Sequence, residues 1–233
     1  EEGSLKRMSE VMREVFTPFL KPQIAALSGP SFAKEVAAGY PTAVVLASKN
    51  QKLAKKVQHL ISCLSLRTYT SDDIIGVELA GAVKNVIAIA AGISDSLHFG
   101  SNSAAALVTR GIAEMARLGV KLGARMETFA GLAGIGDLVL TCTGKLSRNR
   151  YIGCELGKGK SLEDIVSKMR MIAEGITTTL SVHQLARQEK VEMPICEQIY
   201  QVLYKNKEPR EALQDLMARK LKSEFRLKKE KKK

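Results

Sequence analysis

The sequence has few of the residues that most often build metal centres and nucleophilic active sites. Its 233 residues include four cysteines and three histidines. The cysteines are widely spread, without a Cys-x-x-Cys pair or a histidine at metal-ligand spacing, and no histidine adjoins a recognisable nucleophile motif. We therefore predict free, reduced thiols and no metal site. The residues concerned are Cys63, Cys142, Cys154, Cys196, His59, His98 and His183.

Uninterrupted apolar runs of membrane-spanning length are also missing, as is the basic-then-apolar order of a signal peptide. The chain opens with Glu1-Glu-Gly3 and has no initiator methionine. We therefore expect a cytoplasmic protein without an integral membrane segment, and a chain that is a fragment of a longer protein. With 45% hydrophobic and 26% charged residues, it can bury a normal core.

The positive charge is concentrated at the C-terminal end. The net charge is +12, and residues 219–233 carry nine Lys or Arg against two Glu, which leaves +5 for the rest of the chain. This stretch lacks the interleaved aromatic residues of a base-stacking surface. We predict a solvated basic tail over residues 219–233 and no nucleic-acid partner, because a modestly basic body also suits an enzyme for small phosphorylated substrates.

Strand and helix patterns alternate up to about residue 75, and only helices follow. A helix over residues 4–20 precedes strands at 23–28, 42–48 and 66–70, with a short helix ending at Ala38 and a helix capped by Asn50 between them. Ser71 and Asp72 are the predicted caps of the next helix. Further helices are predicted at 101–118, 126–133, 148–156, 162–170, 177–188, 193–204 and 209–217. The pattern indicates an incomplete α/β domain over residues 1–75 and an all-helical domain over residues 76–218.

Lys84 is the residue that points most directly to chemistry. Apolar residues surround it in every direction of a 3.6-residue helix, so the helix should be central and buried. Burial disfavours the charged form of an ammonium group, and a lysine held there can give and take a proton at physiological pH. The alternative is a side chain that reaches along a groove to Glu78 or Asp73. Asn85, a second polar group in the same apolar run, favours a site.

Two further stretches carry polar groups at suggestive spacings. The glycine-dense stretch from Gly131 to Thr141 has no preceding strand in a βαβ unit, so it is not a dinucleotide-binding turn. Its simplest structural interpretation is a close helix-to-helix connection, but Asp137 and Thr141 lie four residues apart and would share one helix face. Ser147-Arg-Asn-Arg150 then opens a helix with several donors, which suits an anion such as a phosphate monoester.

Together these motifs resemble those of the bacterial-type NAD(P)-dependent glycerol-3-phosphate dehydrogenases. The resemblance runs in order from residue 1 to about residue 217. It implies a remnant of a Rossmann domain followed by an all-α C-terminal domain of the 6-phosphogluconate dehydrogenase C-terminal type. The motifs are Gly29-Pro-Ser-Phe-Ala33, Val83-Lys-Asn85, Gly136-Asp-Leu-Val-Leu-Thr141, Ser147-Arg-Asn149 and Ala173-Glu-Gly175.

The resemblance also assigns roles to individual residues. It implies interconversion of dihydroxyacetone phosphate and sn-glycerol 3-phosphate with NAD or NADP, for glycerophospholipid precursors, with Lys84 as the proton donor and acceptor. The resemblance is compatible with a homodimer but does not decide the oligomeric state. The implied substrate contacts are Gly29, Ser31, Lys84, Asp137, Thr141, Ser147, Arg148 and Asn149, and the implied cofactor contacts are Ala33, Arg148, Ile172 and Glu174.

The sequence departs from this family at its start. The family's first strand, its Gly-x-Gly-x-x-Gly turn for the pyrophosphate and a further substrate-contacting lysine are not in the chain. We therefore expect the chain alone to be inactive. Two alternatives stay open: a related two-domain hydroxy-acid dehydrogenase, against which the Ser147-Arg-Asn149 cluster argues, and a basic nucleic-acid-binding helical protein, which only the charge suggests.

Overall fold

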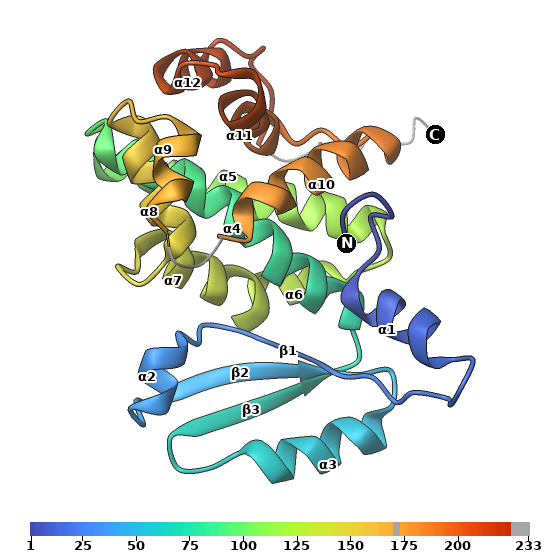
Figure 1. Cartoon of the computed structure of the whole chain (residues 1–233). Coiled ribbons are helices and arrows are strands. Elements are labelled where there is room, and N and C mark those ends of the chain that lie inside the picture. Colours follow the sequence, from blue (N-terminus) through green and yellow to red (C-terminus); the bar gives the residue numbers. More distant parts are fainter. Residues whose placement is uncertain (170–172, 225–233) are drawn as a thin grey trace, which may run out of the picture.

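The computed structural model describes residues 1–169 and 173–224. A small three-stranded sheet forms one layer, and a larger body of helices covers one face of it (Figure 1). Helix α3 lies on the opposite face of the sheet. Helix α1 lies at one end of the sheet, near the start of α4 (Figure 1). This arrangement confirms the predicted fold class, a short α/β segment followed by helices.

The sheet is built from the first third of the chain. After α1 (Met8–Phe16), the elements are β1 (Ala26–Ser28), α2 (Ala33–Ala37), β2 (Thr42–Ala47), α3 (Gln51–Ile61) and β3 (Leu66–Ser71). Strands β2 and β3 are parallel, with Thr42 opposite Leu66, because α3 provides the long crossover that parallel pairing requires. Strand β1 is antiparallel to β2, since the connection through the five-residue α2 simply turns the chain back.

The helix caps were only partly predicted. The Asn50 side chain accepts the backbone N–H groups of Lys52 and Leu53, as expected. The cap of the next helix is Asp73, however, whose carboxylate accepts the Gly76 N–H at 2.9 Å, so the prediction of Ser71 and Asp72 was wrong. The Ser71 hydroxyl instead accepts the Asp73 N–H, and the Asp72 carboxylate pairs with an arginine.

Helix α4 (Ile74–Ser96) is the centre of the molecule, and 16 of its 23 residues are buried. It is the one helix in the described part of the chain that is long and apolar enough to cross a membrane, but 72% of its most apolar window is buried inside the protein. Other helices surround it (Figure 1). It is therefore a core helix, as its uniformly apolar sequence predicts.

The remaining predicted helices appear in the predicted order with shifted ends, but α7 (Asp137–Thr143) was not predicted as a helix. The predicted helix 126–133 is in fact shorter and is followed by one turn of π-helix, η1. The predicted helix 162–170 ends at Ser167, and Arg170 lies outside the described residues, as do residues 225–233 of the basic tail. The elements are α5 (Gly100–Lys121), α6 (Met126–Ala130), η1 (Leu132–Gly136), α7 (Asp137–Thr143), α8 (Arg148–Gly157), α9 (Leu162–Ser167), α10 (Gly175–Gln188), α11 (Pro194–Lys205) and α12 (Pro209–Met217).

Helices α4 and α8 touch backbone to backbone. A Cβ atom added to Gly153 of α8 would lie 1.9 Å from the Ile89 carbonyl oxygen of α4. Only glycine permits that approach, because any side chain would push the two helices apart. The separation between the two helices is thus set by main-chain contact.

A buried carboxylate links α5 to the start of α11. Glu114 is 2% exposed and accepts the backbone N–H groups of Ile195 at 2.8 Å and Cys196 at 3.3 Å. These are first-turn amides that have no partner within their own helix, so the carboxylate caps α11. Burial raises the pKa of Glu114 to about 7, although both hydrogen bonds act in the opposite direction.

We predict that Glu114 makes the folded state less stable as the pH rises from about 4.5 to 7. The folded state keeps a proton that the unfolded state releases in this window, so the free energy of unfolding should fall by roughly 3 kcal/mol. Glu114→Gln removes the ionisation and should flatten that dependence. Urea denaturation at a series of pH values measures both proteins.

Glu127→Gln is the matched control, because Glu127 is exposed on α6. It should leave the pH dependence of stability as in the unaltered chain. The interpretation of Glu114 is wrong if Glu114→Gln and Glu127→Gln give the same curve.

Candidate active site

A cavity of about 230 Å³ lies where the end of β1 and the loop after it meet α4, α7 and the start of α8. Nine of the predicted site residues line it. They are Gly29, Ser31, Lys84, Asp137, Thr141, Ser147, Arg148, Asn149 and Glu174. Residues from five separate stretches of the chain are thus brought together in one place.

Two of the predicted site residues are not among those that line the cavity, and several lining residues had no predicted role. Ala33 begins α2 but does not line the cavity, and Ile172 lies outside the described residues. Asn85 lines the cavity and was recognisable as a polar residue in an apolar run, yet the resemblance gave it no role. The other lining residues without a predicted role are Phe32, Gly81, Leu140 and Leu146.

The Lys84 ammonium group forms an ion pair with the Asp137 carboxylate. The Lys84 side chain is 19% exposed and the Asp137 side chain 3%, so the carboxylate is buried while the ammonium group faces the cavity. Asp137 is the first residue of α7, which continues directly from the π-helical turn η1. The pair places a proton-carrying nitrogen at the cavity wall.

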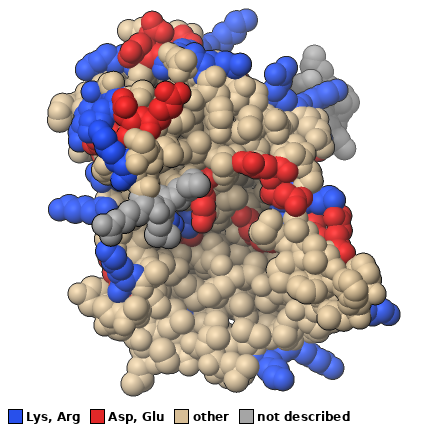
Figure 2. Space-filling model, viewed as in Figure 1, with Lys and Arg blue, Asp and Glu red and all other residues tan. Residues whose placement is uncertain are grey.

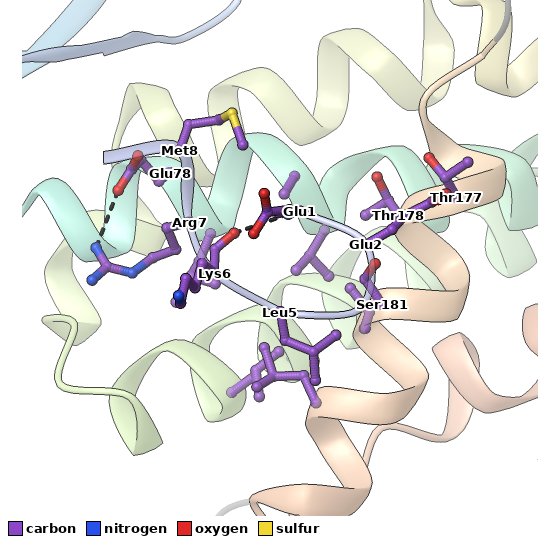
Figure 3. A pocket seen from close by; sticks show the side chains of 16 residues that line it. Glu1, Glu2, Leu5, Lys6, Arg7, Met8, Glu78, Thr177, Thr178 and Ser181 are labelled. Atoms are coloured by element: carbon purple, nitrogen blue, oxygen red, sulfur yellow. Dashed lines mark hydrogen bonds and ion pairs between the residues drawn. The ribbon is translucent and has the colours of Figure 1, made fainter. Parts of the chain in front are cut away.

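The alternative partners of Lys84 are engaged elsewhere. Glu78 accepts from the Arg7 guanidinium at 3.1 Å and from Ser9, which ties the start of the chain to α4 (Figure 3). The Asp73 carboxylate accepts the backbone N–H groups of Gly76 and Arg125 and the Thr128 hydroxyl. Lys84 therefore does not reach along a groove to either carboxylate.

A larger cavity of about 310 Å³ lies against another part of α4, beneath the first eight residues (Figure 3). Its floor is formed by apolar side chains of α4, α5 and α10, including Val83, Leu118 and Val182. Its two basic residues are paired, Arg7 with Glu78 and Lys6 with Glu14, and Glu1 and Glu2 add negative charge. This cavity therefore offers less to an anionic ligand than the one that contains Lys84.

Thr141 supports Asp137 from the next turn of α7. Its hydroxyl donates to the Asp137 carbonyl oxygen at 2.6 Å and lies 3.3 Å from the carboxylate oxygen Oδ1. The predicted four-residue spacing on one helix face is confirmed. The turn of π-helix before Asp137 delivers it to this position.

Two neighbouring arginines at the start of α8 have different partners. Arg150 donates from Nε to Asp95 at 2.9 Å and is thus neutralised within the protein. Among residues 1–169 and 173–224, the Arg148 side chain has neither a hydrogen bond nor an ion pair, and it lines the cavity. The Ser147 hydroxyl caps the helix by accepting the Arg150 N–H at 3.2 Å. Arg148 is therefore a cation that, as far as the described residues show, is available to an anionic ligand.

A relay of two asparagines closes the back of the cavity. The Asn149 amide nitrogen donates to the Asn85 side-chain oxygen at 2.9 Å, and the Gly175 N–H donates to the Asn149 side-chain oxygen at 2.9 Å. Both asparagines are buried. The relay fixes α8 against α4 and the start of α10, and it positions Glu174, which precedes Gly175 at the cavity.

Comparison with known proteins decides the family. Residues 73–214 match the family described as NAD-dependent glycerol-3-phosphate dehydrogenase C-terminus, and residues 1–54 match its N-terminus. The chain belongs to this family. It is 58% identical over 225 residues to the glycerol-3-phosphate dehydrogenase [NAD(P)+] of Syntrophotalea carbinolica, covering 97% of this chain and 68% of that protein. The enzyme of the same name from Syntrophobacter fumaroxidans is also 58% identical, with 97% and 67% covered.

Solved structures agree with this assignment. The crystal structure of glycerol-3-phosphate dehydrogenase from Coxiella burnetii superposes with a TM-score of 0.88 at 45% identity, covering 93% of this chain and 66% of that one. A Plasmodium falciparum structure at 22% identity and TM-score 0.84 shares the fold. The chain spans about two thirds of the length of these family members. The family resemblance and the dependence on NAD(P) predicted from the sequence are confirmed, which decides against the hydroxy-acid dehydrogenase alternative.

Within the described residues, no three His, Cys, Asp or Glu side chains form a group that could hold a metal ion. The face shown in Figure 2 also carries basic side chains that are scattered among acidic ones rather than gathered in one patch. That distribution offers little support for a nucleic-acid surface on this face.

We predict that Gly175→Ala disrupts the asparagine relay and lowers the free energy of unfolding. A Cβ atom there would lie 2.6 Å from the Asn149 side-chain oxygen and 2.9 Å from the Asn85 carbonyl oxygen, so the relay must shift. We expect a loss of about 1–3 kcal/mol, as for other overpacked positions, measured by thermal or urea unfolding.

Gly131→Ala serves as the matched control. Its added Cβ atom would meet nothing closer than 3.5 Å, which is ordinary van der Waals contact. It should cost less than about 1 kcal/mol. Equal losses for both variants would contradict the interpretation of Gly175.

Proposed function

We propose that the cavity around Lys84 is the catalytic site for interconversion of dihydroxyacetone phosphate and sn-glycerol 3-phosphate. The observation that supports this most strongly is the combination, in one cavity, of an ion-paired lysine and an arginine that has no ion pair within the described residues. In this proposal Lys84 faces the oxygen atom on C2 of the substrate and moves a proton to or from that oxygen. Asp137 keeps the lysine in position, and Thr141 keeps Asp137 in position.

We further propose that the phosphate group binds at the start of α8. The Arg148 guanidinium presents several donors in one plane, which matches phosphate oxygens. The first backbone N–H groups of this ten-residue helix and its dipole add to the attraction. Ser147 and Asn149 line the same cavity from α8 and its cap, and Gly29 and Ser31 line it from the loop after β1.

The nicotinamide cofactor is assigned to the side of the cavity that carries Glu174. The exposed Glu174 carboxylate can accept, and the Arg148 guanidinium can donate, hydrogen bonds to a carboxamide, so the residues present fit the group. When bound, this cofactor supplies or takes the hydride at C2. Ala33 stays a proposed contact at the start of α2, and Ile172 stays a proposed contact outside the described residues.

Several broader proposals rest on the same assignment. Residues 1–75 act as the nucleotide-binding part and residues 76–218 as the helical substrate part, with residues 219–233 as a basic tail. The whole protein would be a cytoplasmic enzyme of glycerophospholipid precursor synthesis. Assembly as a homodimer stays a proposal for size measurements, and the lack of activity of the 233-residue chain alone stays a prediction for direct assay.

Lys84→Met in the full-length enzyme should lower turnover by about 10²–10⁴-fold, the usual contribution of a positioned acid or base. Methionine fills a similar volume but carries no proton. Because Asp137 loses its partner, the variant should also be less stable, so turnover is compared per folded protein. Steady-state assays with NADH or NADPH and dihydroxyacetone phosphate measure the effect.

Lys121→Met provides the control for that experiment, since Lys121 is exposed at the end of α5. It should retain the turnover of the unaltered enzyme. If Lys84→Met keeps more than about a tenth of that turnover, Lys84 is not the acid or base.

Arg148→Lys should weaken substrate binding although the charge is preserved. An ammonium group cannot reproduce the two parallel hydrogen bonds of a guanidinium, and we expect kcat/KM to fall by about 10–100-fold, mainly through KM. Arg150→Lys is the matched control, because that arginine binds Asp95 instead of the cavity. An unchanged kcat/KM in Arg148→Lys, or equal losses in both variants, would place the phosphate elsewhere.

A further inference from the structure

The carboxylate that holds Lys84 has a second hydrogen-bond donor from the sheet. The Ser28 hydroxyl lies 3.3 Å from Asp137 Oδ2, the same oxygen that the Lys84 ammonium group contacts. Ser28 is the last residue of β1, and Asp137 is 109 residues further along the chain. Neither the sequence motifs nor the family resemblance gave Ser28 a role.

The surroundings of Ser28 favour this contact. In the part of the chain that the structure describes, Asp137 is the only hydrogen-bond partner of its hydroxyl. A Cβ atom on Gly81 of α4 would lie 3.1 Å from the Ser28 oxygen, so the helix carries no side chain where Ser28 packs. With Thr141 near Oδ1 and Ser28 near Oδ2, each oxygen of the buried carboxylate has a hydroxyl neighbour.

We propose that Ser28 is a positioning residue that sets how strongly Asp137 holds the proton-carrying nitrogen of Lys84. A hydroxyl that donates to a carboxylate disperses part of its negative charge. Without that donor, Oδ2 faces the Lys84 ammonium group alone and attracts it more strongly. Lys84 then gives up its proton at a higher pH. The inference rests on the proposed function only for its catalytic meaning, since the contact itself involves no substrate.

The test is the pH dependence of Lys84 acetylation in the 233-residue chain. Acetic anhydride reacts with the neutral amine, and the partly exposed Lys84 side chain lines an open cavity, so the reagent can reach it. The fraction acetylated at Lys84 is measured by peptide mass spectrometry. In Ser28→Ala we expect the pH at which Lys84 acetylation is half maximal, the acetylation midpoint, to rise by about half a pH unit. Ser28→Thr keeps the hydroxyl, so its acetylation midpoint should return toward the original value.

Ser48→Ala is the matched control, because Ser48 follows β2 and its hydroxyl donates to the Ile24 carbonyl oxygen, away from Asp137. It should leave the midpoint unchanged. Far-ultraviolet circular dichroism checks folding. If Ser28→Ala does not fold, Ser28→Cys takes its place, with a smaller shift in the same direction because a thiol is a weaker donor.

An unchanged or lowered midpoint, or an equal shift in Ser48→Ala, would overturn the proposal. The catalytic meaning is tested in the full-length enzyme, where Ser28→Ala should move the pH dependence of glycerol 3-phosphate oxidation upward by a similar amount. Absence of oxidation in the unaltered full-length enzyme would refute the proposed function while leaving the acetylation result intact. The two failures are therefore distinguishable.

Discussion

The ion pair between Lys84 and Asp137 is the interaction on which the candidate site depends. The Asp137 side chain is 3% exposed and the Lys84 side chain 19% exposed, so each charge would be costly without the other. Helix α4 can carry a lysine in its buried middle only because α7 presents a carboxylate beside it. The glycine-dense stretch before Asp137 folds as a turn of π-helix and brings that carboxylate to the right place. The π-helical turn thus helps to place Asp137 where it can pair with Lys84.

Several features of the fold and of the site could be predicted from the sequence because residues close together in the chain determine them. The burial of α4 follows from apolar residues on all of its faces, and Asp137 and Thr141 share a face because they lie one helical turn apart. The parallel pairing of β2 and β3 follows from the helix between them. Such features need only short-range spacing and periodicity.

Other features could not be predicted because distant residues decide them. Asp73 caps α4 and also accepts from the Arg125 N–H and the Thr128 hydroxyl, more than 50 residues away, so the sequence near residue 72 did not reveal the choice. Arg148 and Arg150 look equivalent in the sequence. Only the position of Asp95 on α4 shows that one arginine is neutralised within the protein.

The main-chain contact between Gly153 and Ile89 has a consequence for selectivity. Lys84 lies on α4 and Arg148 begins α8, and the distance between these helices cannot be adjusted by exchanging one side chain for another. Under the proposed function, the backbone thus fixes the spacing between the proton-carrying Lys84 and the anion-binding Arg148. A molecule that carries an oxygen and a phosphate at that spacing would contact both residues at once, whereas a longer or shorter molecule would contact only one of them.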